Sequence, residues 1–307
     1  CVPASARAAP LVFPLSWGID TEILDGTVMH TALPAECGVD GRLTPSGLDL
    51  LAGLGSTEAR ELLAPEMKKF PGLAKAHDAL KQRFQSVPER NLVNTWLAIV
   101  QRLATESFVP EGVNPKTWRR RLLQTALATW TSFKHTTVLV NATSGAECGD
   151  TFSGFEKLDP EPVRGAVDPL PDAWQRTSLL LKTLGDHAQR LVPDQRFGAI
   201  LREASAKAAG FGTMATRQMR GEALAEKEYA SIQRFAGEIE HPFLLLKSAI
   251  ARKDESGEEG STVIPPPMAK IVDVHSSPEG HLHMAVGNPV ATTVLLPDRG
   301  IQTPASG

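Results

Sequence analysis

Three histidines and an aspartate near the carboxyl end of the chain have the types and spacing that could do chemistry. The set consists of Asp273, His275, His281 and His283. Three imidazoles and one carboxylate are a ligand set suited to zinc. A zinc ion with one open position activates water, and Glu279 or Glu240 would then serve as general base. The sequence therefore raises a metal-dependent hydrolase as one hypothesis.

The residues around this set predict a β-hairpin. Branched aliphatic residues precede the segment Ser276–Gly280, which contains the serine, proline and glycine typical of turns. With that segment as the loop, His275 lies opposite His281, and Asp273 lies opposite His283. Side chains alternate between the faces of a strand, so these four share one face. The other face is apolar, is expected to point into the core, and consists of Val272, Val274, Leu282 and Met284.

The same geometry also favours a competing interpretation of the polar face. Side chains that face each other on paired strands are separated by about 4.5–5.5 Å at Cβ, so four of them form an open patch rather than a closed tetrahedron. A solvated histidine face without metal is the alternative, and it is the one that the spacing favours.

Composition limits the classes to which the protein can belong. The chain has 307 residues, of which 42% are hydrophobic and 22% charged, so it is neither disordered nor built from membrane spans. No apolar stretch approaches the roughly 18 residues needed to cross a bilayer. The net charge of −3 gives no general attraction to nucleic acid. The basic run Trp118–Arg121 is expected to form surface ion pairs at the start of a helix rather than phosphate contacts.

The first residue suggests a compartment. Cys1 is followed by VPASARAAP, a small-residue and proline-containing segment typical of a flexible tether. This arrangement resembles a bacterial lipoprotein after signal removal, which would hold the protein at a membrane only through a lipid anchor. Two alternatives stay open: an amino-terminal nucleophile freed by cleavage, and a fragment boundary.

The two other cysteines have matching surroundings. Cys37 and Cys148 both follow Ala-Glu and precede Gly. In an oxidising compartment such a pair most simply forms a disulfide, which stabilises a protein by roughly 2–4 kcal/mol. The alternative is two free thiols in a cytosolic protein. We expect the disulfide, and with it a periplasmic, outer-membrane-anchored or secreted location.

Apolar residues at helical spacing fill the middle of the chain and predict a mainly α protein. The predicted helices are 48–54, 56–65, 72–85, 91–105, 114–140, 172–191, 195–217 and 224–240. Segment 12–39 shows no helical period, and Val290–Leu296 predicts a third strand beside the hairpin. The fold class is thus a multi-helix body with a small C-terminal antiparallel β-sheet. The predicted divisions are a tether with an irregular segment (1–43), a helical body (44–253), a linker (254–267) and a β module packed on the helices (268–307).

Several segments, taken in order, resemble an uncharacterised bacterial family, domain of unknown function 3160. They are PSGLDLLAGLGS at 45–56, LQTALATW at 123–130, KHTTVL at 134–139 and VDVH at 272–275. The resemblance spans roughly residues 47–300. It implies a secreted protein or lipoprotein that forms the carboxyl half of something larger, with a complementary amino-terminal half or chain as partner. His281 and His283 lie outside the family pattern, so a metal site using them would be particular to this protein.

No strong catalytic signature occurs in the sequence. It has no nucleophile elbow, no phosphate-binding glycine loop, no paired-cysteine motif and no HExxH. Whether the chain is an enzyme is therefore left open, and zinc is the only cofactor that the residues suggest. We expect an exported, envelope-associated interaction or scaffold subunit that acts by association with protein partners.

Overall fold

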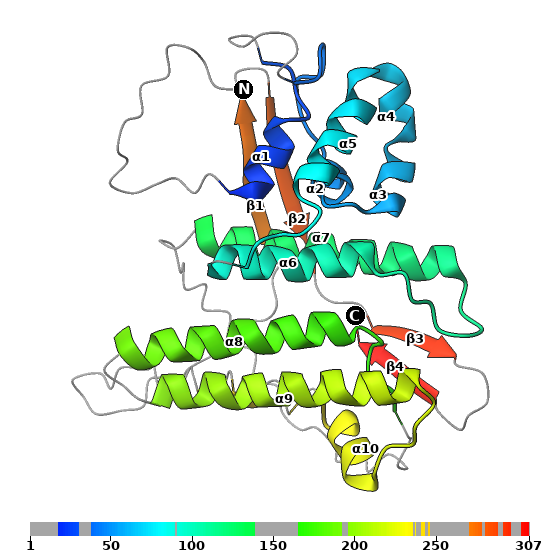
Figure 1. Cartoon of the computed structure of the whole chain (residues 1–307), viewed down its shortest axis with the longest axis vertical. Coiled ribbons are helices and arrows are strands. Elements are labelled where there is room, and N and C mark those ends of the chain that lie inside the picture. The colour runs from blue at the N-terminus through cyan, green and yellow to red at the C-terminus, as the bar shows by residue number, and fades with distance from the viewer. Residues whose placement is uncertain are drawn as a thin grey trace, which may run out of the picture. The chain divides into compact units, whose positions relative to one another are not determined.

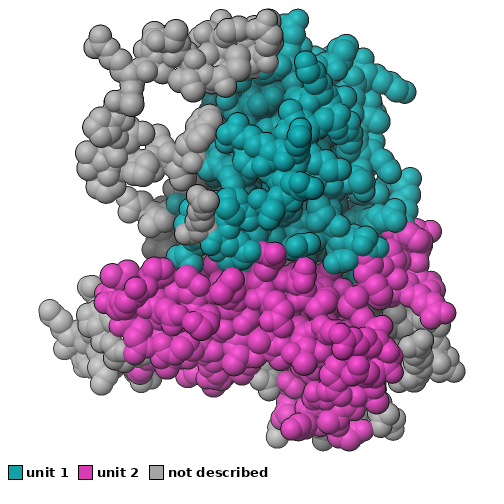
Figure 2. Space-filling model, in the orientation of Figure 1, with its two compact units in different colours: residues 1–107, 116–142, 269–287 teal, residues 108–115, 143–268, 288–307 magenta. Residues whose placement is uncertain are grey.

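In a computed structural model the chain forms two compact units, coloured separately in Figure 2. The structure describes residues 18–30, 38–89, 91–138, 165–191, 196–235, 237, 241–242, 245, 270–277, 280–287, 291–295 and 302–306. Unit 1 comprises residues 1–107, 116–142 and 269–287, and unit 2 comprises residues 108–115, 143–268 and 288–307. Each unit therefore combines segments from distant parts of the chain, whereas the sequence suggested consecutive divisions. The predicted linker, 254–267, lies outside the described residues.

Unit 1 contains the first seven helices and the first hairpin (Figure 1). Its elements are α1 (Ile19–Asp25), α2 (Gly47–Gly53), α3 (Thr57–Leu62), α4 (Ala64–Lys69), α5 (Gly72–Arg83), α6 (Leu92–Thr105), α7 (Pro115–Val138), β1 (Lys270–Ser277) and β2 (Gly280–Val286). Side chains of Ser46, Ser56 and Asn91 cap α2, α3 and α6 by accepting hydrogen bonds from backbone N–H groups of the first turn. The core centres on side chains that are almost wholly buried, among them Ile23, Leu24, Leu50, Leu51, Leu54, Leu63, Leu73 and Trp130.

Helix α1 corrects the expectation of an irregular segment over residues 12–39. Ile23 and Leu24 are buried in it, and Ile23 approaches Gly53 of α2 so closely that a Cβ on Gly53 would lie 2.6 Å from Ile23 Cγ2. The start of α1 carries no side-chain cap, so the sequence has no start signal for this short helix. Its stability comes from tertiary packing.

Unit 2 is built on an antiparallel helix pair. Its elements are α8 (Pro171–Leu191), α9 (Arg196–Met219), α10 (Glu226–Gln233), β3 (Ala291–Leu295) and β4 (Gln302–Ser306). Trp174 of α8 packs against Phe211 of α9 with ring centroids 5.5 Å apart, and Phe235 contacts both rings. Met214 is buried in the same cluster.

The strands form two separate antiparallel pairs, β1–β2 and β3–β4. The prediction of a strand near Val290–Leu296 is confirmed by β3, but its assignment as a third strand of the first sheet is wrong. β3 pairs instead with β4, which follows it closely in the sequence, because a local hairpin requires only a short loop to close. The predicted class, mainly α with a small C-terminal antiparallel sheet, is confirmed. In the part of the chain that is described, no helix is long and apolar enough to span a bilayer.

Candidate functional site

The register of the β1–β2 hairpin decides which of the predicted site residues share a face. Asp273 pairs with His283, as the sequence predicts. The predicted pairing of His275 with His281 is wrong, and so is the predicted loop Ser276–Gly280: β1 continues to Ser277 and β2 begins at Gly280. The register then shifts between Asp273 and His275, where β1 carries an extra residue. His275 pairs with Leu282 instead. Such a β-bulge moves every later side chain of its strand to the opposite face.

The bulge takes His275 off the polar face and puts Ser276 there. Ser276 pairs with His281 and is exposed, whereas His275 is half-buried beside the apolar side chains. We call the solvent-exposed side the outer hairpin face; it consists of Ile271, Asp273, Ser276, His281, His283 and Ala285. Three of the four predicted ligands thus lie on one face of the hairpin, and His275 does not.

A hydrogen-bonded chain runs across the outer hairpin face. Ser276 Oγ donates to Asp273 Oδ2 over 2.8 Å, and His281 Nδ1 lies 3.0 Å from the same Ser276 oxygen. His283 lies beside His281, with ring centroids 6.1 Å apart and planes inclined by 32°. The face therefore presents two neighbouring imidazoles, one of which is oriented by a serine and a carboxylate.

His275 occupies a different environment from these exposed histidines. Its Nδ1 atom is buried and has no hydrogen-bond partner among the described residues. Burial lowers the pKa of His275, and the nearby charges of Asp25 and Asp273 oppose this effect only in part, while His30 adds to it. The neutral imidazole is thereby favoured at the junction between α1 and β1.

The hairpin is held to the helices from several sides. Val272 is buried, and His135 of α7 has its Nδ1 3.0 Å from the backbone oxygen of Ile271, a geometry in which the ring N–H donates. Met284 packs where Gly47 has no side chain, since a Cβ at Gly47 would lie 2.8 Å from Met284 Cε. His135 lies in the last turn of α7, and nothing in the sequence around it signals this link, which joins residues far apart in the chain.

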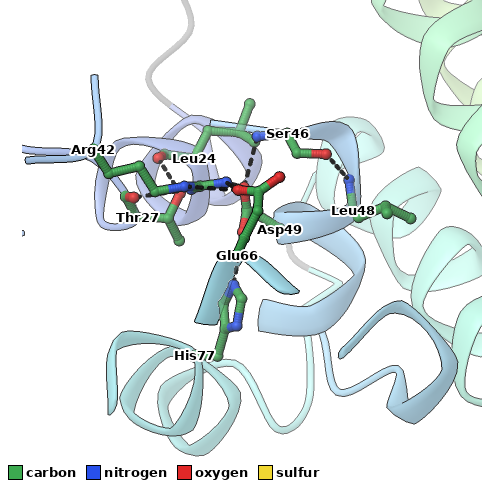
Figure 3. A network of polar contacts seen from close by, with 8 residues as sticks. All are labelled: Leu24, Thr27, Arg42, Ser46, Leu48, Asp49, Glu66 and His77. Atoms are coloured by element: carbon green, nitrogen blue, oxygen red, sulfur yellow. Dashed lines mark hydrogen bonds and ion pairs between the residues drawn. The ribbon is translucent and has the colours of Figure 1, made fainter. Parts of the chain in front are cut away.

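A buried polar network lies in the helical part of unit 1 (Figure 3). Asp49 at the start of α2 accepts hydrogen bonds from three directions: Arg42 Nη2 at 2.7 Å, the Ser46 backbone N–H at 2.6 Å and His77 Nε2 at 2.8 Å. Arg42 also donates to the Thr27 carbonyl oxygen, at 2.9 Å. Asp49 and His77 have no solvent exposure.

Glu66 of α4 is the last member of this network and connects it to a further helix. Its Oε2 accepts from Arg42 Nη2 at 2.7 Å and from Nε at 3.1 Å. Arg42 therefore joins α2 to α4, and Asp49 joins both to α5 through His77. A carboxylate with this many donors and no exposed surface is suited to holding helices together rather than to meeting a substrate. The only sequence signal was the capping pattern that begins at Ser46.

A second buried carboxylate fastens α1 to α7. Asp20 Oδ2 accepts from Trp130 Nε1 at 3.1 Å and pairs with Lys134 Nζ at 2.8 Å. In the predicted basic run, Arg120 pairs with Glu58 at 3.0 Å, in line with the expected ion pairs. These ion pairs join helices of unit 1. One links α1 to α7, and the other links α7 to α3.

The remaining predicted site residues are the three cysteines and two glutamates. Cys1, Cys37, Cys148, Glu240 and Glu279 lie outside the described residues. Among the residues that are described, no three His, Cys, Asp or Glu side chains are grouped so that they could hold a metal ion. The disulfide, the lipidated cysteine and the general base stay predictions from the sequence.

Comparison with known proteins identifies a family. A family model with the description "Protein of unknown function (DUF3160)" matches residues 19–307. No curated protein matches the chain, and no solved structure matches it. The match covers the segments that resemble this family, at 45–56, 123–130, 134–139 and 272–275.

Proposed function

Since the chain belongs to the DUF3160 family of proteins of unknown function, we propose its role from its own residues. The protein is an exported, envelope-associated interaction subunit of a larger assembly. The outer hairpin face is the surface through which it contacts a protein partner.

The observation that carries this proposal is that the outer hairpin face is exposed and yet firmly supported. A two-stranded hairpin alone is marginal in water. Here Val272 is buried under the sheet, and the contact between His135 and Ile271 ties β1 to α7. A preformed surface loses less conformational entropy on binding than a flexible one, which favours association.

The composition of the face suits a protein partner. Ile271 is 60% exposed, and Ala285, its partner in the register, is exposed beside it. At the other end of the face, Asp273, His281 and His283 supply hydrogen-bonding groups. An apolar contact next to directional polar groups is typical of the core and rim of a protein–protein interface.

The buried polar groups support association over catalysis. Asp49 and His77 are inaccessible to solvent, and Asp49 is surrounded by donors from the protein itself. Asp20 is likewise engaged with Trp130 and Lys134. These groups hold the helices that carry the hairpin, so they contribute to the face by positioning it.

Export is the part of the proposal that rests on the sequence. A disulfide between Cys37 and Cys148 would require an oxidising compartment, and the family resemblance implies a secreted protein or lipoprotein. Fractionation of the cells that make the protein tests this part. Recovery in the envelope or medium is expected, and recovery in the cytosol alone would refute it.

The interaction is tested by matched charge substitutions. In Ile271→Asp a carboxylate replaces the exposed apolar side chain of the outer hairpin face. Val93→Asp, on α6, makes the same change at an apolar residue that is 38% exposed and lies outside the face. Gentle extraction from the native cells and sizing should give a complex larger than the chain for wild type and for Val93→Asp, but a smaller species for Ile271→Asp. A wild-type chain that is monomeric in its own cells, or equal dissociation of both variants, would refute the proposed role.

A further inference from the structure

We propose that His281 and His283 form a chelating site for a divalent transition-metal ion, with Zn²⁺ as the ion of interest. This inference goes beyond the interaction role and does not depend on it. It replaces the set of four ligands expected from the sequence with a pair of imidazoles on one strand. Ser276 and Asp273 do not bind the metal in this proposal; they orient His281.

The first support is the placement of the two rings. Residues two apart on a strand point to the same side, and both His281 and His283 are exposed on the outer hairpin face. Their ring centroids are 6.1 Å apart and their planes are inclined by only 32°. Small side-chain rotations, which exposed rings can make without disturbing the core, would direct one nitrogen of each ring to a common ion. Imidazole nitrogens suit Zn²⁺, Cu²⁺ and Ni²⁺.

The second support is the hydrogen-bonded chain that fixes the tautomer of His281. An ionised carboxylate only accepts hydrogen bonds, so the Ser276 hydroxyl must donate its one hydrogen to Asp273. His281 Nδ1 must then be the donor in its 3.0 Å contact with Ser276 Oγ. In the neutral ring this leaves the lone pair on Nε2, the atom farther from the backbone. In metal sites, a histidine that binds the ion through one ring nitrogen usually donates a hydrogen bond through the other.

The bulge in β1 explains why this site uses two histidines and not three. It turns His275 toward the apolar side and brings Ser276 to the position opposite His281. Ser276, which orients His281, therefore occupies the position that the sequence predicted for His275. With two protein ligands, the remaining positions of the ion stay open to water. Asp273, directly opposite His283, adds a negative charge that favours a cation at this face.

Zinc titration of the full chain, purified without a histidine tag and freed of metal, tests the site by calorimetry. Wild type should bind one Zn²⁺ with a dissociation constant in the micromolar range. His281→Ala and His283→Ala should each weaken binding by tenfold or more, because a single imidazole does not chelate. His187→Ala, on α8, removes a histidine outside the proposed site and should leave the dissociation constant unchanged.

Ser276→Ala distinguishes a built site from two histidines that happen to be adjacent. Loss of the orienting hydroxyl should weaken Zn²⁺ binding by about tenfold while both ligands are kept. X-ray absorption at the zinc edge should show two imidazole nitrogens in wild type. No binding of Zn²⁺ up to about 1 mM, or equal binding by wild type and both His→Ala variants, would overturn the proposal. Equal binding by wild type and Ser276→Ala would overturn the role given to Ser276. Circular dichroism should be the same for all variants, since the substituted side chains are exposed or partly exposed.

Discussion

At the residue scale, Asp49 is the buried carboxylate on which Arg42, the Ser46 backbone and His77 converge. Asp49→Ala would leave the guanidinium of Arg42 and the imidazole of His77 buried without their shared acceptor. Breaking a buried charge pair by removing one partner typically costs about 3–5 kcal/mol, so we expect a loss of that size in the free energy of unfolding. Urea unfolding followed by tryptophan fluorescence measures it.

The control for Asp49 is Asp78→Ala on α5, which removes an ion pair with Arg60 at an exposed position. Exposed pairs contribute little, so this variant should unfold at nearly the wild-type urea concentration. If Asp49→Ala were no less stable than Asp78→Ala, the network would not hold the helices together as described.

His275 should make stability depend on pH. Its pKa in the folded protein lies below the ordinary value of 6.5, so the unfolded chain binds more protons once the pH falls below about 6.5. Stability is therefore complete above that pH and decreases as the pH falls toward the lowered pKa of the folded state. Urea unfolding between about pH 7.5 and 5, in the presence of a chelator, should show a steeper loss for wild type than for His275→Gln. Parallel curves for the two proteins would show that burial of this ring is not linked to folding.

The sequence predicted the positions of three of the four site residues on the hairpin, but not that of His275. Alternation along a strand correctly placed Asp273, His281 and His283 on one face, because that periodicity is a property of the backbone. It failed at His275, because a one-residue bulge depends on how two strands fit together and leaves no mark in local composition. Ser276 was assigned to the loop, and its link to Asp273 and His281 follows only from the observed register.

At the scale of elements, the α8–α9 pair depends on two glycines at the contact between the helices. A Cβ at Gly198 would lie 2.9 Å from Gln189 Oε1 and 3.0 Å from the Gly185 carbonyl oxygen. Gly198→Ala should therefore push the helices apart and lower the free energy of unfolding by roughly 1–3 kcal/mol, despite the better helix propensity of alanine. Thermal unfolding measures the change.

Gly210→Ala, in the same helix, provides the matched control. A Cβ there would meet nothing within 4 Å, so only the helix propensity changes and stability should rise by roughly 1 kcal/mol. Two Gly→Ala substitutions in one helix should thus shift the melting temperature in opposite directions. A shift of the same sign in both would contradict the close packing at Gly198.

The elements that the sequence predicted are those with a clear apolar repeat or a capping signal. Helices such as α5, α6 and α9 repeat apolar residues over several turns, and their positions agree with the predicted ranges. α1 was missed because it has no side-chain cap to mark its start, whereas the equally short α2 has the Ser46 cap before its leucines. β4 was missed because Pro304, which cannot donate to a strand ladder, argues against a strand.

At the scale of the whole molecule, the sequence predicts a covalent link between residues that are far apart in the chain. Cys37 and Cys148 should form a disulfide in protein isolated from its own cells. Peptide mapping by mass spectrometry without reduction should find the two cysteine peptides joined, and reduction should lower the melting temperature because the unfolded chain gains freedom. Two free thiols in the native protein would remove this link and weaken the case for export.

The chain's division into units could not have been predicted from its sequence. Each unit is assembled from segments that are distant in the chain, and the first hairpin belongs to the same unit as α1 and α7. Composition and periodicity report only on neighbouring residues. The contacts that bring the hairpin onto these helices, such as His135 with Ile271 and Met284 with Gly47, become visible only in three dimensions.

The most direct test of the central claim is site-specific photo-crosslinking in the living cell. A photoreactive amino acid in place of Ala285 would sit on the outer hairpin face, and one in place of Asp78 would sit on an exposed part of α5 in the same unit. We predict that irradiation joins a distinct envelope protein to the chain from position 285 and not from position 78. Equal adducts from both positions, or none from position 285 in cells that assemble the protein normally, would contradict a role for this face in association.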